Sequence, residues 1–122
     1  MSDIDVSHLA EFCPKYERAI SILGKRWTGL LLRAMFAGSC SFSSISAYVP
    51  CLSDRILSER LKELEAEGIV ERRVYPETPV RIEYVLTQKG QDLRPVVDAV
   101  QVWADGWIEY EEHAGVPAGH HA

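Results

Sequence analysis

The first half of the chain carries apolar residues at helical spacing in three successive segments. Pro14 can open the first helix, because proline at the first helical position lacks an N–H that would have no partner there, and Gly24 ends it. A second segment runs from near Lys25 to Gly38, and a short third one stops before Pro50. The residues predicted to face inward are Tyr16, Ala19, Ile20 and Leu23, then Trp27, Leu30, Leu31, Ala34 and Met35, and finally Phe42, Ile45, Tyr48 and Val49.

A fourth helix is predicted over residues 53–67. Ser53 is a suitable N-cap, because its hydroxyl can accept a hydrogen bond from a backbone N–H of the first turn, and Gly68 can end the helix. The inward face of this helix carries Leu57, Leu61 and Leu64. Its opposite face is polar, so the helix is expected to lie at the surface.

The period of the pattern then changes to two, which predicts strands at 69–75 and 80–86. One face is formed by Val70 and Val74 in the first strand and by Val80, Ile82, Tyr84 and Leu86 in the second. Two registers preserve this face, and one of them sets Arg73 opposite Arg81. The other sets Arg73 opposite Glu83, Tyr75 opposite Arg81 and Val74 against Ile82. Opposite charges favour the second register.

Thr87 is predicted to cap a long last helix that Pro95 bends. Its helically spaced apolar residues are Leu93, Val96, Val97, Val100, Ala104, Trp107 and Ile108. Residues 1–12 show no such pattern and are predicted to be a flexible arm, and 114–122 to be a disordered tail. One domain is therefore expected over residues 13–113.

The predicted order places three helices directly before a hairpin, and the third of these helices is capped and amphipathic. This order is typical of a winged helix–turn–helix. The predicted fold class is mainly α with a small antiparallel β-hairpin.

The net charge of −5 is unevenly distributed over the 122 residues. All 13 Lys and Arg residues lie within 14–97 beside 10 acidic residues, so that stretch has a balance of +3. The asymmetry indicates a middle that faces a polyanion and acidic ends that lie away from it. No apolar run approaches the ~18 residues of a membrane span, and the acidic N-terminus lacks the apolar core of a secretory signal. The chain is therefore expected in the cytoplasm.

Three stretches resemble a known family. They are "CPKYERAISILGKRW" at 13–27, "LSDRILSERLKELEAEGIVERRVYP" at 52–76 and "RIEYVLTQKG" at 81–90. The chain resembles the HxlR-type winged-helix transcriptional regulators of bacteria, which are related to the MarR group. The resemblance implies a homodimer that binds operator DNA and regulates transcription.

The polar face of the fourth helix is the candidate for reading DNA in the major groove. Arg55 can donate two hydrogen bonds to guanine, and Glu59 can accept one from cytosine. Lys62 is better placed for phosphate. The other residues predicted near DNA bases are Ser53, Asp54 and Ser58. The alternative is an ordinary solvated helix face, and the hairpin that follows favours DNA reading over it.

The hairpin tip, residues 75–81, is the candidate wing. Arg73, Tyr75 and Arg81 are predicted to contact DNA, with Arg81 near the tip and free for phosphate. Replacing Arg81 by Ala is then expected to flatten the salt dependence of binding by about one unit. The alternative role for these charges is to guard an exposed strand edge against aggregation, and both roles can hold.

The last helix carries more aromatic surface than one core needs, which indicates an interface. The resemblance favours a homodimer formed by the first and last helices. The predicted interface residues are Tyr16, Ile20, Val100, Trp103, Trp107 and Ile108. A two-fold dimer would set the two reading helices about 34 Å apart. The alternative is that both tryptophans pack within one protomer.

Three cysteines without CxxC spacing disfavour a structural disulfide framework in a reducing compartment. Cys13 lies at a predicted helix start near two cations, a setting that favours the reactive thiolate. Cys51 lies just before the reading helix. The resemblance implies oxidant or quinone sensing through Cys13, since some relatives respond through a cysteine at that position, sometimes by bridging to the second subunit. Cys51 is a possible partner because of its own position. Small buried thiols are the ordinary alternative, and Cys40 is expected to be inert.

No metal or cofactor is expected, because His8, His113, His120 and His121 lack the spacing of metal ligands. The chain has no phosphate loop, nucleophile elbow or apolar carboxylate pair, so an enzyme is not predicted. Two alternatives to thiol control and DNA binding stay open. One is a small aromatic effector held between Trp27, Phe42 or Tyr48 and the dimer helices. The other is a winged helix that binds protein.

Overall fold

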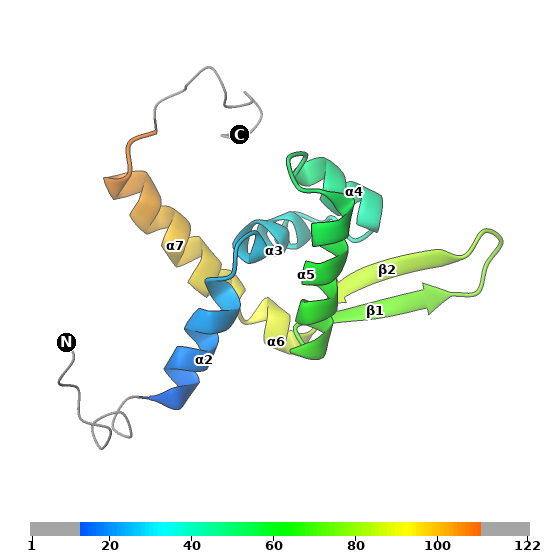
Figure 1. Cartoon of the computed structure of the whole chain (residues 1–122), viewed down its shortest axis with the longest axis horizontal. Helices are drawn as coiled ribbons and strands as arrows, with labels where there is room; N and C mark the ends of the chain where they lie inside the picture. Colours follow the sequence, from blue (N-terminus) through cyan, green and yellow to red (C-terminus); the bar gives the residue numbers. More distant parts are fainter. Residues whose placement is uncertain (1–12, 111–122) are drawn as a thin grey trace.

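The structure is a computed structural model and describes residues 13–110. Its elements, labelled as in Figure 1, are α2 (Pro14–Leu23), α3 (Thr28–Phe36), α4 (Phe42–Tyr48), α5 (Asp54–Ala66), β1 (Val70–Tyr75), β2 (Arg81–Leu86), α6 (Gln88–Gln91) and α7 (Arg94–Trp107). The order matches the predicted winged helix–turn–helix. The predicted arm 1–12, the tail 114–122 and the domain boundary at 113 lie outside the described residues.

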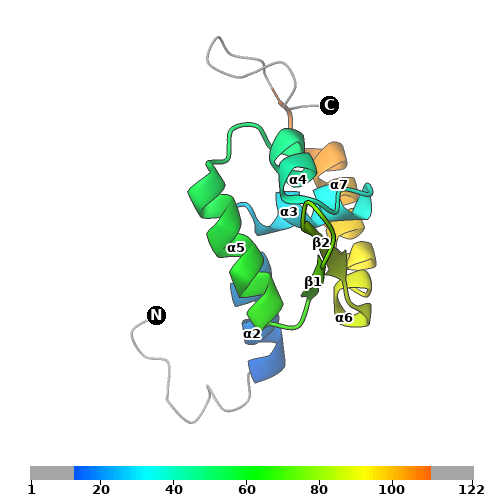
Figure 2. The same cartoon turned by 90° about the vertical axis from the view of Figure 1, so that its right-hand side faces the viewer.

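The hydrophobic core lies where α3, α4, α5 and the base of the hairpin meet. Its fully buried large side chains are Leu31, Leu32, Ile45, Leu57, Leu61 and Ile69. Leu57 and Leu61 come from α5, as the predicted leucine face requires. Figure 1 shows α5 crossing the base of the hairpin, while β1 and β2 project well beyond it, and Figure 2 shows α5 standing clear on one side of the molecule. This arrangement fixes α5 by one side and leaves its other side outward.

The predicted helix starts are confirmed by hydrogen bonds. Ser53 Oγ accepts from the backbone N–H of Ile56 at 3.2 Å, and Thr87 Oγ1 accepts from that of Gly90 at 3.2 Å. Pro14 occupies the first turn of α2. A further cap precedes α4, where Ser41 and Ser44 exchange side-chain and backbone hydrogen bonds in a capping box. Local chemistry in the sequence therefore accounts for where these helices begin.

The predicted inward face of α3 was wrong by one position. Leu30 is 42% exposed, whereas Leu32, which the pattern left out, is fully buried. The helix also begins at Thr28, after a turn in which Trp27 has a φ of +80°, and not near Lys25. A non-glycine residue in this left-handed region reverses the chain direction. The buried residues of α3 are Thr28, Leu31, Leu32, Ala34 and Met35.

The hairpin has the register that charge pairing favoured. Arg73 lies opposite Glu83, Tyr75 opposite Arg81 and Val74 opposite Ile82. The backbone N–H of Tyr84 also donates to the carbonyl oxygen of Cys40 at 2.7 Å, which ties β2 to the segment before α4. The apolar face is buried only at its base, because Val74 and Val80 are 50% and 59% exposed. The outer half of the hairpin therefore projects away from the core.

The predicted long last helix is two helices. A turn after α6 reorients the chain, and Pro95 stands in the first turn of α7 and so does not bend a continuous helix. Gly90 explains the close fit of α6: a Cβ added there would lie 2.3 Å from the carbonyl oxygen of Ile69. Of the predicted α7 stripe, Val97 is buried, whereas Val96, Val100, Trp107 and Ile108 are exposed.

Candidate nucleic-acid interface

The outward face of α5 is polar and no described segment covers it. Arg55 and Glu59 are exposed and form an ion pair one turn apart, with Arg55 Nη1 3.1 Å from Glu59 Oε2. Lys62, one turn further, is exposed and makes no contact with another described side chain. These three residues therefore occupy the surface opposite the buried leucines, as the sequence indicated.

The N-terminal end of α5 is organised by short polar contacts. Ser53 caps the helix, and Asp54 Oδ1 accepts a hydrogen bond of 3.5 Å from Ser46 Oγ of α4. Ser58 is half-buried and its side chain makes no hydrogen bond within the described chain. An acidic residue in the first turn suits the positive end of the helix dipole.

One face of the wing carries a closed cluster of charges. Arg81 bonds Glu77 through Nη2 and Oε2 at 3.2 Å and Glu83 through Nη1 and Oε2 at 2.5 Å. Its guanidinium also lies over the ring of Tyr75, 3.9 Å from the ring centroid. Hydrogen bonding to Glu77 raises the pKa of the Arg81 guanidinium. In the free protein Arg81 is therefore paired within the wing and not free as expected, and its contact with phosphate stays a prediction.

Arg73 belongs to the same face and is paired in the same way. Its Nη2 lies 3.2 Å from Glu71 Oε1, and hydrogen bonds with Tyr75 and then Glu71 raise the pKa of its guanidinium. Alternation along the strand predicted that Arg73 and Tyr75 share a face, but the competition from nearby glutamates was not recognised. The sequence already indicated this competition, since Glu71, Glu77 and Glu83 each lie two to four residues from an arginine.

Arg72 is the wing cation that the sequence analysis did not single out as a site. It lies opposite Tyr84, on the face of the hairpin to which the buried Val70 also belongs. Its side chain is exposed and makes no hydrogen bond, ion pair or ring contact with any described residue. The alternation of side chains along the strand could have indicated Arg72, because Arg72 lies on the same strand face as Val70 and Val74.

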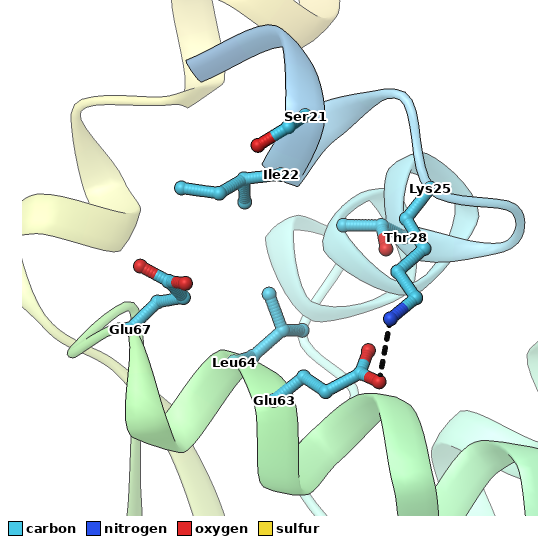
Figure 3. A pocket seen from close by; sticks show the side chains of 7 residues that line it. All are labelled: Ser21, Ile22, Lys25, Thr28, Glu63, Leu64 and Glu67. Carbon is cyan, nitrogen blue, oxygen red and sulfur yellow. Dashed lines mark hydrogen bonds and ion pairs between the residues drawn. The ribbon is translucent and has the colours of Figure 1, made fainter. Parts of the chain in front are cut away.

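Helix α2 approaches α5 across a polar cavity of about 210 Å³. Figure 3 shows its lining, with Ser21 and Ile22 from α2, Lys25 and Thr28 beyond it, and Glu63, Leu64 and Glu67 from the C-terminal half of α5 and its cap. Lys25 Nζ lies 2.8 Å from Glu63 Oε2, and Arg18 Nη2 lies 2.6 Å from Glu67 Oε2. Helix α2 has no buried residue. One ion pair from α2 and one from the turn after it therefore join this part of the chain to the C-terminal end of α5, beside the partly buried Ile22.

The predicted dimer residues all lie at the surface. Tyr16 and Ile20 project from α2, and the exposed large apolar residues of the last helix and its end include Val100, Trp103, Trp107 and Ile108. An apolar groove of about 270 Å³ runs between α3 and α7, lined by Leu23, Leu30, Val96, Val97 and Val100 among others. The alternative in which both tryptophans pack within one protomer is wrong for the described chain, since both are exposed.

The three cysteines are exposed free thiols, so none is the buried thiol of the ordinary alternative. Cys13 is the residue directly before α2, and its side chain makes no cap hydrogen bond. Cys51 lies in the turn between α4 and α5, two residues before the Ser53 cap. Cys40 is exposed as well, and its backbone carbonyl is tied to β2. Exposure alone therefore does not separate Cys40 from the other two.

The aromatic residues proposed to hold an effector differ in burial. Trp27 and Phe42 are partly buried against the core, and Tyr48 is exposed. Within residues 13–110 no group of three or more His, Cys, Asp or Glu side chains is placed to hold a metal ion, and all four histidines lie outside that range. No helix in the same range is long and apolar enough to span a membrane.

Comparison with known proteins identifies the family. The model of the HxlR-like helix-turn-helix family matches residues 22–112. The HTH-type transcriptional regulator YvaP of Bacillus subtilis is 54% identical over 100 residues, which cover 82% of this chain and 93% of YvaP. The regulator YodB of the same organism is 50% identical over 97 residues, covering 80% of this chain and 87% of YodB.

Solved structures agree with this assignment. The reduced form of YodB superposes with a TM-score of 0.73 at 48% identity, covering 83% of this chain and 99% of YodB. The reduced form of the redox regulator HypR gives a TM-score of 0.71 at 35% identity, covering 75% of this chain and 91% of HypR. Diamide-treated and quinone-bound forms of YodB are among the similar structures. The chain therefore belongs to the HxlR-like helix-turn-helix family and is a transcriptional regulator.

Proposed function

We propose that this regulator binds operator DNA as a homodimer, with α5 in the major groove and the wing along the sugar–phosphate backbone. The observation that carries the proposal is the outward face of α5, which is anchored by buried leucines on one side and left open on the other. A helix held in this way keeps its polar residues in fixed directions. Base recognition needs that rigidity, because a bidentate contact discriminates by about 1–3 kcal/mol when the side chain is well placed against the base edge.

Arg55 and Glu59 are the base readers in this proposal. In the free protein each satisfies the other across one helical turn, so both must exchange partners when DNA binds. An exposed ion pair is worth about 0–1 kcal/mol, which makes this exchange inexpensive. Ser53, Asp54 and Ser58 complete the base-facing end, and Lys62 neutralises a phosphate. The discrimination then comes from the N-terminal half of α5.

A homodimer through α2 and α7 fits the distribution of exposed apolar residues. Trp103, Trp107 and Val100 would be buried against a second copy, which removes an apolar surface that is unfavourable in water. The two α5 helices must then be about 34 Å apart to enter successive major grooves on one side of the duplex.

Thiol oxidation at Cys13 is the proposed signal, with Cys51 as its candidate partner. The likeness to YodB in diamide-treated and quinone-bound forms supports oxidants and quinones as effectors. Cys13 adjoins α2, which is linked to the C-terminal end of α5 by Arg18–Glu67, and the turn after α2 is linked to α5 by Lys25–Glu63. A covalent change at Cys13 that displaces α2 would therefore act on the helix that reads DNA.

A footprint on the intergenic DNA beside the coding sequence tests the proposal. We expect a protected site with approximate two-fold symmetry under reducing conditions and altered protection after treatment with diamide. The variants Arg55→Ala and Glu59→Ala should lose sequence preference while keeping unspecific binding. No binding to any duplex, together with capture of a protein partner, would favour the protein-binding winged helix instead.

A further inference from the structure

We infer that Arg72 is the wing residue that contacts DNA phosphate, whereas Arg73 and Arg81 hold the shape of the hairpin. The inference rests on the proposed function, because it assigns a role within the same DNA interface. It replaces the sequence-based choice of Arg81, and three observations carry it.

The first observation is the face on which Arg72 lies. Residues alternate across a strand, so Arg72 shares a face with Val70, and the partners of that face in β2 are Tyr84 and Leu86. Val70 is buried, and Tyr84 and Leu86 pack against the same core as the α5 leucines. This face therefore continues outward from the side of the hairpin that meets α5. Arg73 and Arg81 lie on the reverse side.

The second observation is the state of each guanidinium. Arg73 is paired with Glu71, and Arg81 is paired with both Glu77 and Glu83. The cluster around Arg81 has more carboxylates than guanidinium groups and presents no excess positive charge to a polyanion. Arg72 makes no hydrogen bond, ion pair or ring contact with another described residue. It can bind phosphate without giving up an internal partner, and its full charge is available for counterion release.

The third observation is a second cation without an ion-pair partner on the proposed DNA-facing surface. Lys62 projects from the outward side of α5 and has no partner among residues 13–110. With α5 in the major groove, Lys62 from the helix and Arg72 from the wing can each neutralise a backbone phosphate without breaking an internal ion pair. Half-exposed Val74, next to Arg72 on the same face of the hairpin, supplies apolar contact for the sugars.

The salt dependence of binding tests the inference. Affinity for the footprinted duplex and for an unrelated duplex of equal length is measured across a salt series under reducing conditions. For Arg72→Gln we expect the slope of log K against log salt to flatten by about one unit on both duplexes, with the ratio of the two affinities unchanged. Arg72→Lys should restore most of the slope, because phosphate neutralisation needs the charge and not the guanidinium fork.

Two comparisons make the result specific. Lys15→Gln removes an equally exposed and unpaired cation from α2 and should keep the wild-type slope. The double variant Arg81→Gln with Glu77→Gln removes an ion pair without changing the net charge, and it should also keep that slope. A flattened slope for this double variant with an unchanged slope for Arg72→Gln would overturn the inference in favour of Arg81. A changed affinity ratio for Arg72→Gln would overturn it in favour of base reading. Failure of the wild type to bind either duplex would instead reject the proposed function.

Discussion

The guanidinium of Arg81 lies flat over the ring of Tyr75, 3.9 Å from the ring centroid, across the last pair of the hairpin. The contact adds a cation–π attraction to the two ion pairs of Arg81. A single side chain thereby ties together both strands and the loop. The wing is stiffened by this cluster before any DNA is present, so ordering it on binding costs little conformational entropy.

Glu77→Gln is expected to strengthen DNA binding. Glu77 is a carboxylate at the wing tip, and its loss leaves Arg81 with Glu83 as its remaining ion pair. The local charge rises by one, so the salt dependence of binding should steepen by up to about one unit. A salt series with Glu109→Gln, which removes an exposed carboxylate beyond α7, provides the control. Weaker binding by Glu77→Gln would show that the intact cluster matters more for wing shape than its charge does.

Ser53→Ala is expected to lower the free energy of unfolding by about 1 kcal/mol. The change removes the acceptor for the backbone N–H of Ile56 at the start of α5. Ser58→Ala, inside the same helix, is the matched control and should change stability by less than about 0.5 kcal/mol, because no described hydrogen bond is lost. Urea unfolding of both variants measures the difference. Equal losses would mean that the cap contributes nothing beyond the removal of a hydroxyl.

The sequence predicted those parts of the fold that local chemistry determines. Caps at Ser53 and Thr87, the leucine face of α5 and the strand register each follow from a few neighbouring residues, and the structure confirms them. The register was decided by the charges of Arg73, Arg81 and Glu83. Opposite charges predicted the pairing correctly. The same charges also form ion pairs with one another, and the sequence analysis did not conclude from this that Arg81 would be paired.

The errors arose where tertiary contacts override the pattern. Helical spacing continues through residues 88–107, so periodicity alone gave one helix where the chain turns after α6. The turn depends on Gly90 meeting the carbonyl of Ile69, a contact between residues far apart in sequence. Leu32 is buried and Leu30 exposed because the core packs against the side of α3 that carries Thr28, Leu31, Leu32 and Met35, which periodicity alone did not select. The sequence analysis did not single out Arg72, because it did not weigh the glutamates that pair with Arg73 and Arg81 in the wing.

Gly90→Ala is expected to destabilise the fold by about 1–3 kcal/mol. A methyl group would press on the Ile69 carbonyl at 2.3 Å and on Leu86 Cδ2 at 3.0 Å, so α6 must move away from the strands. Gly106→Ala in α7, where an added Cβ meets nothing within 4 Å, is the control and should leave stability equal or higher by up to about 1 kcal/mol. Thermal unfolding of the two variants checks the contrast. Unchanged stability of Gly90→Ala would contradict the packing of α6.

Trp103→Glu is expected to convert a dimer into monomers. The tryptophan is 60% exposed in one protomer and lies on the α7 face with Val96, Val100 and Trp107, so a buried carboxylate would replace it in the interface. Val102→Glu makes a comparable change at a side chain that is 71% exposed on another face of α7, and should leave the dimer intact. Sedimentation velocity gives the mass of each. A dimer for Trp103→Glu, or a monomeric wild type, would reject this interface.

Cys13→Ser is expected to abolish the response of operator binding to diamide, whereas Cys40→Ser should retain it. All three thiols are exposed, so the distinction rests on position: Cys13 adjoins α2, Cys51 precedes the cap of α5, and Cys40 has its backbone tied to β2. Loss of the response in Cys51→Ser as well would identify the partner thiol. On a non-reducing gel, a diamide-dependent band at dimer mass that is absent from Cys13→Ser or from Cys51→Ser would place the bond between protomers. A monomer band that migrates faster would place it within one protomer. Wild-type protein that shows neither a crosslink nor a change in operator affinity would end the proposal that thiol oxidation is the signal.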